Sequence, residues 1–341
     1  MKTKLFSIAV IATCFATMTQ AQQKFNVQNG TKTEFYDDLG TAVQKAVSGD
    51  TIYLPGGIIK YSNDELIIDK KLALIGAGCD IDSIGGLQRT ELRKNSSIGY
   101  TDLIITFGEG SNGSLITGCV FGTIGNNAAN LENITIYRNY INYGIGLSNQ
   151  SKNIFIRENV INGGINGGNA TNCWINNNLI FGYHITYGFY ATMSNLNNSY
   201  ICNNVIYNSY SIDYTFACTF ENNYIGTSSL GGTNCTFNHN AFIGEVNFPY
   251  NSNAGSNNLI NQQTINTFQG DYLNYPKNLQ IREDSPCKNA GTDGTDIGIF
   301  GSSTPYMAIP FNPHIEKAVI GSQTDNAGNL KVDIKVSARN R

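Results

Sequence analysis

The chain is poor in charged residues, and it is poorest where its sequence is most regular. Of 341 residues, 14% are Asp, Glu, Lys or Arg, and the formal net charge is −3. Between Cys119 and Asn240 only seven residues are charged. A mildly acidic chain of this kind lacks the basic surface that nucleic-acid binding requires. It also has few candidates for a catalytic set in this region.

Proline is missing from the segment Gly56 to Phe248, whereas five of the seven prolines follow residue 270. Because proline cannot donate a hydrogen bond within a central strand, the proline-free segment suits a continuous sheet. The proline-rich region from 303 onward is predicted to be an appendage packed on that sheet or an attachment tail, with one strand from Leu330 to Ser337.

Long apolar runs are missing too, so no transmembrane segment is predicted. The apolar run from Leu5 to about Ala16 follows Lys2 and Lys4, which is typical of a signal peptide spanning residues 1 to 21. Attachment as a lipoprotein through Cys14 is the weaker alternative. The protein is therefore expected to be secreted or to lie on the cell surface.

Asparagine, by contrast, is abundant and recurs at a regular interval. Six asparagines lie in the frame (Ile or Phe)-x-x-Asn-x-(Ile or Phe), at spacings of 20, 19, 26, 19 and 17 residues. The apolar positions alternate with polar ones, as in strands, and the period is too short for paired helices. Each repeat is therefore predicted to be one coil of strands and turns. The six are Asn139, Asn159, Asn178, Asn204, Asn223 and Asn240.

These asparagines are predicted to face the interior of the coil. Coils stack about 4.8 Å apart, so each carboxamide can donate a hydrogen bond to the next. Cys119 fills the same position one coil earlier. A second asparagine ladder is predicted six residues before the first, and it is interrupted by Ala217. Its members are Asn133, Asn153, Asn172, Asn198 and Asn234.

The segments that flank the repeats resemble a known family. Asp37 to Val47 has the apolar spacing of a short helix that would plug the first end of the coil. The sequences AVSGDTIYLPGG and LIIDKKLALIGAG follow it, and SPCKNAGTDGTDIGIFG begins at Ser285. Together they resemble secreted right-handed parallel β-helix proteins of Bacteroidetes-type bacteria, with the pectin-lyase-like fold. The resemblance implies the fold and leaves the activity open.

The expected architecture is all-β. A right-handed parallel β-helix spans residues 22–302, with a cap at 35–50, regular coils at about 51–248 and a closing segment up to 302. An appendage follows at 303–341. No Cys/His spacing suggests zinc, and Asp293 and Asp296 in a glycine turn are weak grounds for calcium, so no cofactor is predicted. Whether Cys218 and Cys235, on neighbouring coils, form a disulfide stays open.

Four of the seven charges are predicted to form surface ion pairs between adjacent coils, Arg138 with Glu158 and Glu132 with Lys152. Arg157 and Glu221 share a position in the repeat but lie three coils apart, about 14 Å. Asp213 has no partner carboxylate in its column on the neighbouring coils, whereas a glycosidase needs two. Nor does the basic and calcium-binding grouping of a polysaccharide lyase of this fold occur.

The longest interval, from Asn178 to Asn204, holds the sequence-based candidate site. Its surplus residues are rich in aromatics, which suit stacking against sugar rings. The alternative is that tyrosine and phenylalanine are simply good strand formers there. The candidate binding residues are Tyr183, His184, Tyr187, Tyr190, Tyr210, Asp213 and Tyr214.

Two functions fit these observations. The favoured one is a secreted or surface protein that binds an extracellular polysaccharide, or serves as a scaffold, without catalysis. The alternative is a polysaccharide lyase or glycoside hydrolase, which the family resemblance alone implies. The sequence does not specify an oligomeric state.

Overall fold

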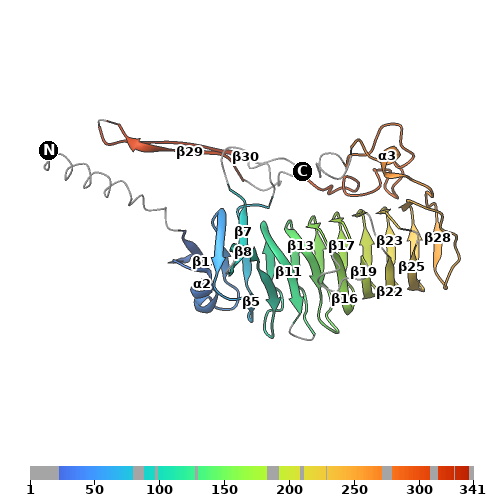
Figure 1. Cartoon of the computed structure of the whole chain (residues 1–341), viewed down its shortest axis with the longest axis horizontal. Coiled ribbons are helices and arrows are strands. Elements are labelled where there is room, and N and C mark those ends of the chain that lie inside the picture. The colour runs from blue at the N-terminus through green and yellow to red at the C-terminus, as the bar shows by residue number, and fades with distance from the viewer. Residues whose placement is uncertain are drawn as a thin grey trace, which may run out of the picture.

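The chain winds into a parallel β-helix, an elongated stack of coils that Figure 1 shows from the side. The computed structural model describes residues 23–79, 88–96, 99–126, 130–182, 192–207, 211–227, 229–270, 279–307, 314–325 and 327–337. Nearly all regular structure in these residues is β, and most strands pair in parallel. The predicted all-β parallel β-helix is confirmed.

One face of the stack is a 12-stranded sheet, here called sheet A. It receives one short strand from each coil, and equivalent residues pair in register, as Ile136 does with Ile156. Its parallel strands are β3 (Thr51–Tyr53), β6 (Ala73–Ile75), β10 (Leu115–Thr117), β12 (Thr135–Tyr137), β14 (Phe155–Arg157), β17 (Trp174–Asn176), β20 (Tyr200–Cys202), β23 (Thr219–Glu221), β26 (Thr236–Asn238) and β28 (Ala254–Ser256).

A 16-stranded sheet forms the rest of the wall. In the later coils it has a short strand directly after the asparagine and a longer strand after a bend. The short strands are β15 (Val160–Ile161), β18 (Leu179–Ile180), β21 (Val205–Ile206), β24 (Tyr224–Ile225) and β27 (Ala241–Phe242). The longer ones are β16 (Gly164–Thr171), β19 (Met193–Asn197), β22 (Ile212–Phe216) and β25 (Leu230–Thr233). The earlier coils contribute β4 (Gly57–Tyr61), β5 (Glu65–Ile68), β7 (Thr90–Ser96), β8 (Gly99–Asp102), β9 (Ile104–Phe107), β11 (Cys119–Asn126) and β13 (Tyr140–Gly146).

The middle residue of each three-residue strand of sheet A from β3 to β26 points into the lumen. Ile136, Ile156 and Ile175 are completely buried there, and Phe220 stacks on Phe237 with ring centroids 4.6 Å apart. Each such side chain contributes about 2 kcal/mol through burial. The first and third residues of the same strands therefore face outward.

The six repeat asparagines stack at the corner after sheet A and are fully buried. Oδ1 of Asn159 accepts two hydrogen bonds from Asn139, one from its backbone N–H (2.9 Å) and one from Nδ2 (3.2 Å). The same pair of bonds recurs at each step as far as Asn240, and then once more from Asn240 to Asn258. The sequence frame missed Asn258 because Gly255 fills its apolar position. These residues form the asparagine column.

The second predicted ladder is wrong. Its asparagines are exposed or half-buried at the outside of another corner, and none is fully buried. Their backbone, and that of Ala217, has left-handed φ angles between 45° and 59°. Asparagine tolerates this conformation better than most residues, so the backbone turn and not side-chain stacking explains its recurrence here.

The N-terminal end of the stack is capped. Helix α2 (Leu39–Lys45) begins where the Asp38 side chain accepts a hydrogen bond from the Thr41 N–H (2.7 Å). It lies against the hairpin of β1 (Phe25–Asn29) and β2 (Lys32–Tyr36), and β1 pairs antiparallel with β3. The helix predicted at this end is confirmed. No helix in the described ranges is long and apolar enough to cross a membrane.

Residues 279–307 run back along the outside of the coils (Figure 1). We call them the closing segment. Together with Phe268, which follows helix α3 (Thr264–Thr267), they cover the outward side chains of the short strands. This second apolar core includes Val160, Leu179, Val205, Tyr224, Ile281, Cys287, Ile297, Ile299 and Tyr306.

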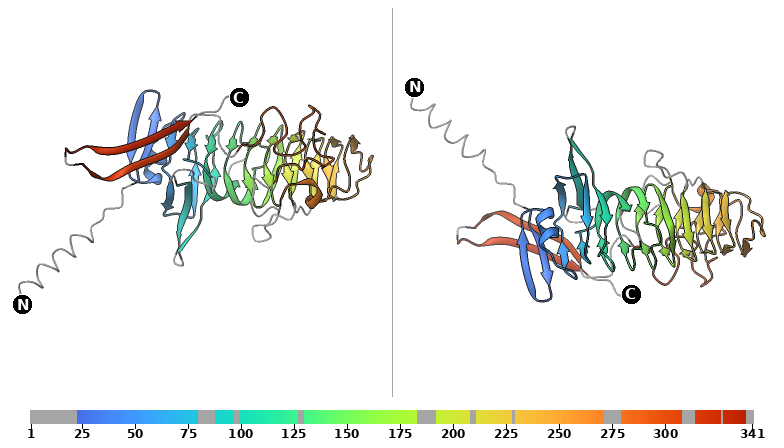
Figure 2. Two further views of the ribbon diagram at one scale, coloured as in Figure 1. Left: turned by 90° about the horizontal axis from the view of Figure 1, so that it is seen from above. Right: turned by 90° about the horizontal axis from the view of Figure 1, so that it is seen from below.

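The chain continues into an antiparallel hairpin of β29 (His314–Thr324) and β30 (Leu330–Ser337). Among the strands that the structure describes, these two pair only with each other. Figure 2 shows the hairpin projecting toward the N-terminal end of the stack. The β appendage and its strand from Leu330 to Ser337 were predicted correctly.

Candidate functional site

The outward face of sheet A brings together side chains that lie far apart in sequence. The first positions of β14, β17 and β20 hold Phe155, Trp174 and Tyr200, which pair in register on neighbouring strands. These three residues form the aromatic row. The third positions of β12 to β23 form a parallel polar row of Tyr137, Arg157, Asn176, Cys202 and Glu221.

The aromatic row is open to solvent. Trp174 is 47% exposed and Phe155 is 39% exposed. The rings of Trp174 and Tyr200 meet edge to face, with centroids 5.2 Å apart. Neighbouring strands are about 4.8 Å apart, so the three side chains follow one line across the sheet.

Arg157 and Glu221 mark the two charged positions of the polar row. The guanidinium of Arg157 lies 4.5 Å from the centroid of the Tyr137 ring, within the range of a cation–π contact. Glu221 Oε1 accepts a hydrogen bond from the Thr292 hydroxyl (2.7 Å), so the closing segment borders this end of the row. On the outward positions of β10 to β28, all within the described part of the chain, Glu221 is the only carboxylate.

The thiol of Cys202 and the phenol of Tyr200, both on β20, stay protonated at neutral pH. Burial, followed by the charge of Glu221, raises the pKa of Cys202 to about 12. Burial, followed by the charges of Cys202 and Glu221, also raises the pKa of Tyr200 far above its usual range. At neutral pH the Cys202 thiol is therefore not a nucleophile, and Tyr200 presents a hydroxyl that can form hydrogen bonds.

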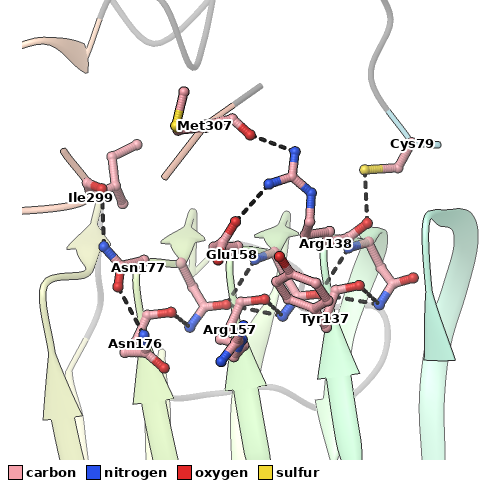
Figure 3. A network of polar contacts seen from close by, with 12 residues as sticks. Cys79, Tyr137, Arg138, Arg157, Glu158, Asn176, Asn177, Ile299 and Met307 are labelled. Atoms are coloured by element: carbon pink, nitrogen blue, oxygen red, sulfur yellow. Dashed lines mark hydrogen bonds and ion pairs between the residues drawn. The ribbon is translucent and has the colours of Figure 1, made fainter. Parts of the chain in front are cut away.

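A buried ion pair lies at the corner beside the polar row (Figure 3). Arg138 and Glu158 are 2.6 Å apart, and their side chains are only 14% and 11% exposed. Arg138 also donates to the Met307 carbonyl of the closing segment, which covers the pair. The pair was predicted, but its placement on the open surface is wrong because the closing segment lies over it. The pair of Glu132 and Lys152 (2.8 Å) does lie at the surface.

Burial and charge act in opposite directions within this pair. Burial raises the pKa of Glu158 against the opposing effect of the Arg138 charge. Burial is the largest single influence on the pKa of Arg138 and lowers it, but Glu158, together with smaller contributions from Tyr137, Tyr306 and Cys79, raises the pKa overall. The Arg138 guanidinium therefore stays charged, and the Glu158 carboxylate is the negative charge that balances it.

The closing segment contacts this corner on several coils. The residues at this corner directly precede the asparagine column, and we call them the corner column. Asn177 donates to the Ile299 carbonyl (3.1 Å), and the Asn222 carbonyl accepts from Gly298 N–H (2.8 Å). The His239 ring lies 3.0 Å from the Ala290 carbonyl. The corner column comprises Arg138, Glu158, Asn177, Asn203, Asn222 and His239.

Most of the site predicted from the sequence lies outside the described residues. This applies to Tyr183, His184, Tyr187, Tyr190 and Tyr210. Asp213 and Tyr214 lie on β22, in the other sheet. Asp213 Oδ2 accepts from the Ser211 hydroxyl (2.5 Å), and Tyr214 is 76% exposed. The structure therefore does not test this cluster as a whole.

The aromatic row was missed in the sequence, although a signal for it exists. Its three members each stand four residues before a repeat asparagine, the same outward position of successive coils. They are 19 and 26 residues apart along the chain, so no local crowding draws attention to them.

The described residues offer no group of three or more His, Cys, Asp or Glu side chains that could hold a metal ion. Asp296 accepts from Lys288 Nζ (3.2 Å) and from Asn289 N–H (3.0 Å). Asp293 accepts from Thr295 N–H (3.1 Å). Asp293 thus accepts within the glycine turn, and Asp296 accepts from the residues just before it. Among the described cysteines no disulfide is formed, so Cys218 and Cys235 are not bonded to each other.

Comparison with known proteins adds little about activity. No protein-family model matches the chain, and no curated protein does so either. Among solved structures, the catalytic domain of a GH87 alpha-1,3-glucanase in complex with tetrasaccharides is similar, with a TM-score of 0.38 and 17% sequence identity. The similarity covers 67% of this chain and 44% of that one. The chain thus spans less than half the length of that domain.

Proposed function

We propose that the protein binds a polysaccharide along the outward face of sheet A and does not cleave it. The aromatic row carries this proposal, because it places three rings in line across neighbouring strands of a flat, exposed sheet. Aromatic faces stack against the apolar faces of sugar rings, and groups such as Asn176 and Glu221 can bind hydroxyls beside them.

Binding without cleavage fits the distribution of acids. A glycoside hydrolase needs two carboxylates that flank one bond, and Glu221 is alone on the described outward positions of β10 to β28. Glu158 lies nearby but is engaged with Arg138. A lyase or hydrolase stays the alternative, and catalytic turnover would reveal it.

The location expected for the protein, outside the cell or on its surface, agrees with a polysaccharide ligand. A signal peptide at residues 1 to 21 would export the chain, and the resemblance of its flanking segments to secreted bacterial pectin-lyase-like β-helix proteins belongs to the same proposal. The polysaccharide is then an extracellular one.

Trp174 provides a direct test, because it is the only tryptophan of the chain. Titration with neutral and acidic polysaccharides should change its fluorescence where a sugar stacks on the ring. The same mixtures should release no reducing or unsaturated ends over time. Turnover of such ends would contradict the non-catalytic proposal, and no binding to any polysaccharide would contradict the proposal altogether.

Calorimetry with variants then locates the site. Trp174→Ala should weaken binding at least about tenfold, as expected for a central aromatic contact. Phe35→Ala is the matched control, since Phe35 is an exposed aromatic of β2 at the far edge of the same sheet and is 65% exposed. If Tyr214→Ala weakens binding and Trp174→Ala does not, the ligand lies instead on the face predicted from the sequence.

A further inference from the structure

The C-terminal end of sheet A is a strand that pairs on one side only among the described strands. β28 is the last strand of sheet A and lies at the end opposite α2 (Figure 1). Ala254 N–H donates to the Cys235 carbonyl (2.9 Å), and the Ser256 carbonyl accepts from His239 N–H (3.0 Å). Because successive residues of a parallel strand bond to opposite sides, the N–H and C=O of Gly255 face the open end.

The last rung of the asparagine column is open in the same direction. In the preceding rungs, the backbone N–H and Nδ2 of one asparagine converge on Oδ1 of the next, at 2.9 Å each from Asn204 to Asn223. Asn258 receives these bonds from Asn240, and its own Nδ2 donates to the Phe237 carbonyl (2.7 Å). Among the described residues, no acceptor receives the Asn258 N–H.

The repeat itself specifies what fits this end. Each earlier rung is covered by a parallel strand that brings a carboxamide oxygen to the point where the two donors converge. We propose that this end binds an extended strand of a partner protein, parallel to β28, that carries asparagine at the equivalent position. This mode of recognition is strand addition to a sheet edge, with the backbone supplying affinity and one side chain supplying specificity.

A second copy of the chain fits less well. Its N-terminal end begins sheet A with the antiparallel hairpin of β1 and β2, which cannot supply a parallel strand. Two copies joined through β28 about a two-fold axis would pair antiparallel, and the donors of Asn258 would not meet a carboxamide in the register of the column.

A peptide from the chain's own repeat is a suitable probe. A fluorescent peptide with the sequence of residues Thr236 to Ile243 contains the strand, the corner and the asparagine equivalent to Asn258. It should bind to the wild-type protein, and hydrogen exchange at Gly255 and Asn258 should slow on binding. Two altered peptides serve as controls while the protein stays unchanged. One replaces the asparagine that corresponds to Asn240 by leucine, and the other is N-methylated at its third residue, whose N–H would donate to the Gly255 carbonyl.

Each altered peptide lacks hydrogen bonds that the proposal requires, so each should bind at least about fivefold more weakly. Equal binding of all three peptides, or slowed exchange anywhere other than β28 and Asn258, would overturn the proposal. So would the absence of peptide binding. A doubling of the protein's mass by light scattering that is accompanied by slowed exchange at Gly255 and Asn258, without peptide, would assign this end to a second copy and overturn it as well.

Discussion

At the residue scale, the corner column shows how the coil selects its side chains. Each of its members has a left-handed φ between 52° and 58°. Asparagine and histidine adopt this conformation with little strain, whereas arginine and glutamate rarely do so. Arg138 and Glu158 hold it nonetheless, because their mutual ion pair and the contact with Met307 fix both side chains.

Breaking this ion pair should be costly, and replacing it should not be. Glu158→Gln leaves the covered Arg138 charge uncompensated and is expected to lower the free energy of unfolding by about 2 kcal/mol. The double variant Arg138→Asn with Glu158→Asn restores the residue type of the neighbouring coils, and should stay within about 1 kcal/mol of the wild type. Urea denaturation measures both. Equal losses in the two variants would contradict this explanation.

Replacing an asparagine of the column should reduce stability far more than replacing an asparagine of the other corner. Asn178→Leu removes the acceptor of the Asn159 backbone N–H, which then stays buried and unsatisfied, whereas Asn159 Nδ2 keeps the carbonyls of Ile136 and Arg157. The expected loss is about 3 kcal/mol. Asn153→Gly, at a half-buried left-handed corner, should change stability by less than about 0.5 kcal/mol. Thermal and urea unfolding compare the two, and similar losses would show that the column is not what stabilises the coils.

At the scale of elements, the closing segment is a second layer with its own core. Its apolar side chains pack on the short strands, and its polar contacts follow the corner column. It can therefore open while the lumen stays packed, because the two cores bury different residues.

Ile299→Ala should loosen this layer alone. It removes a fully covered side chain from the outer core, which typically costs about 2 to 4 kcal/mol. Exchange should quicken at Gly298, whose amide bonds the coil at Asn222, and at Tyr306, whose amide bonds Ile299, while amides of β14 and β17 keep their protection. Ile265→Ala is the control, since Ile265 is 79% exposed. Faster exchange throughout the coil would mean that the two layers unfold together.

At the scale of the whole molecule, the regular part of the fold could be predicted from the sequence and the candidate site could not. The inward positions repeat because every coil must fill the same lumen, so the pattern of Ile136, Ile156 and Ile175 is visible along the chain. Outward positions need not repeat. Phe155, Trp174 and Tyr200 become neighbours only through the register of sheet A. The path of the closing segment leaves no periodic signal, which is why the burial of Arg138 was missed.

The terminal hairpin should be dispensable for the coil. β29 and β30 pair with each other, and the exposed side chains of β30 include Val332 and Ile334. Deletion of residues 308–341 is expected to change the unfolding free energy of the coil by less than about 0.5 kcal/mol. Circular dichroism melting tests this, and a drop of several degrees would show that the hairpin supports the fold.

The closing segment has one more consequence, which concerns how such a chain can evolve. A stack of equivalent coils can gain or lose a whole coil by duplication or deletion without disturbing the contacts between layers. Here a single segment touches the coils from His239 back to Arg138, through Ala290, Thr292, Ile299 and Met307 in turn. One coil more or fewer beneath it would move every later contact out of step. The length of the closing segment thus limits the number of coils. Adding a coil would require a matching insertion in the closing segment.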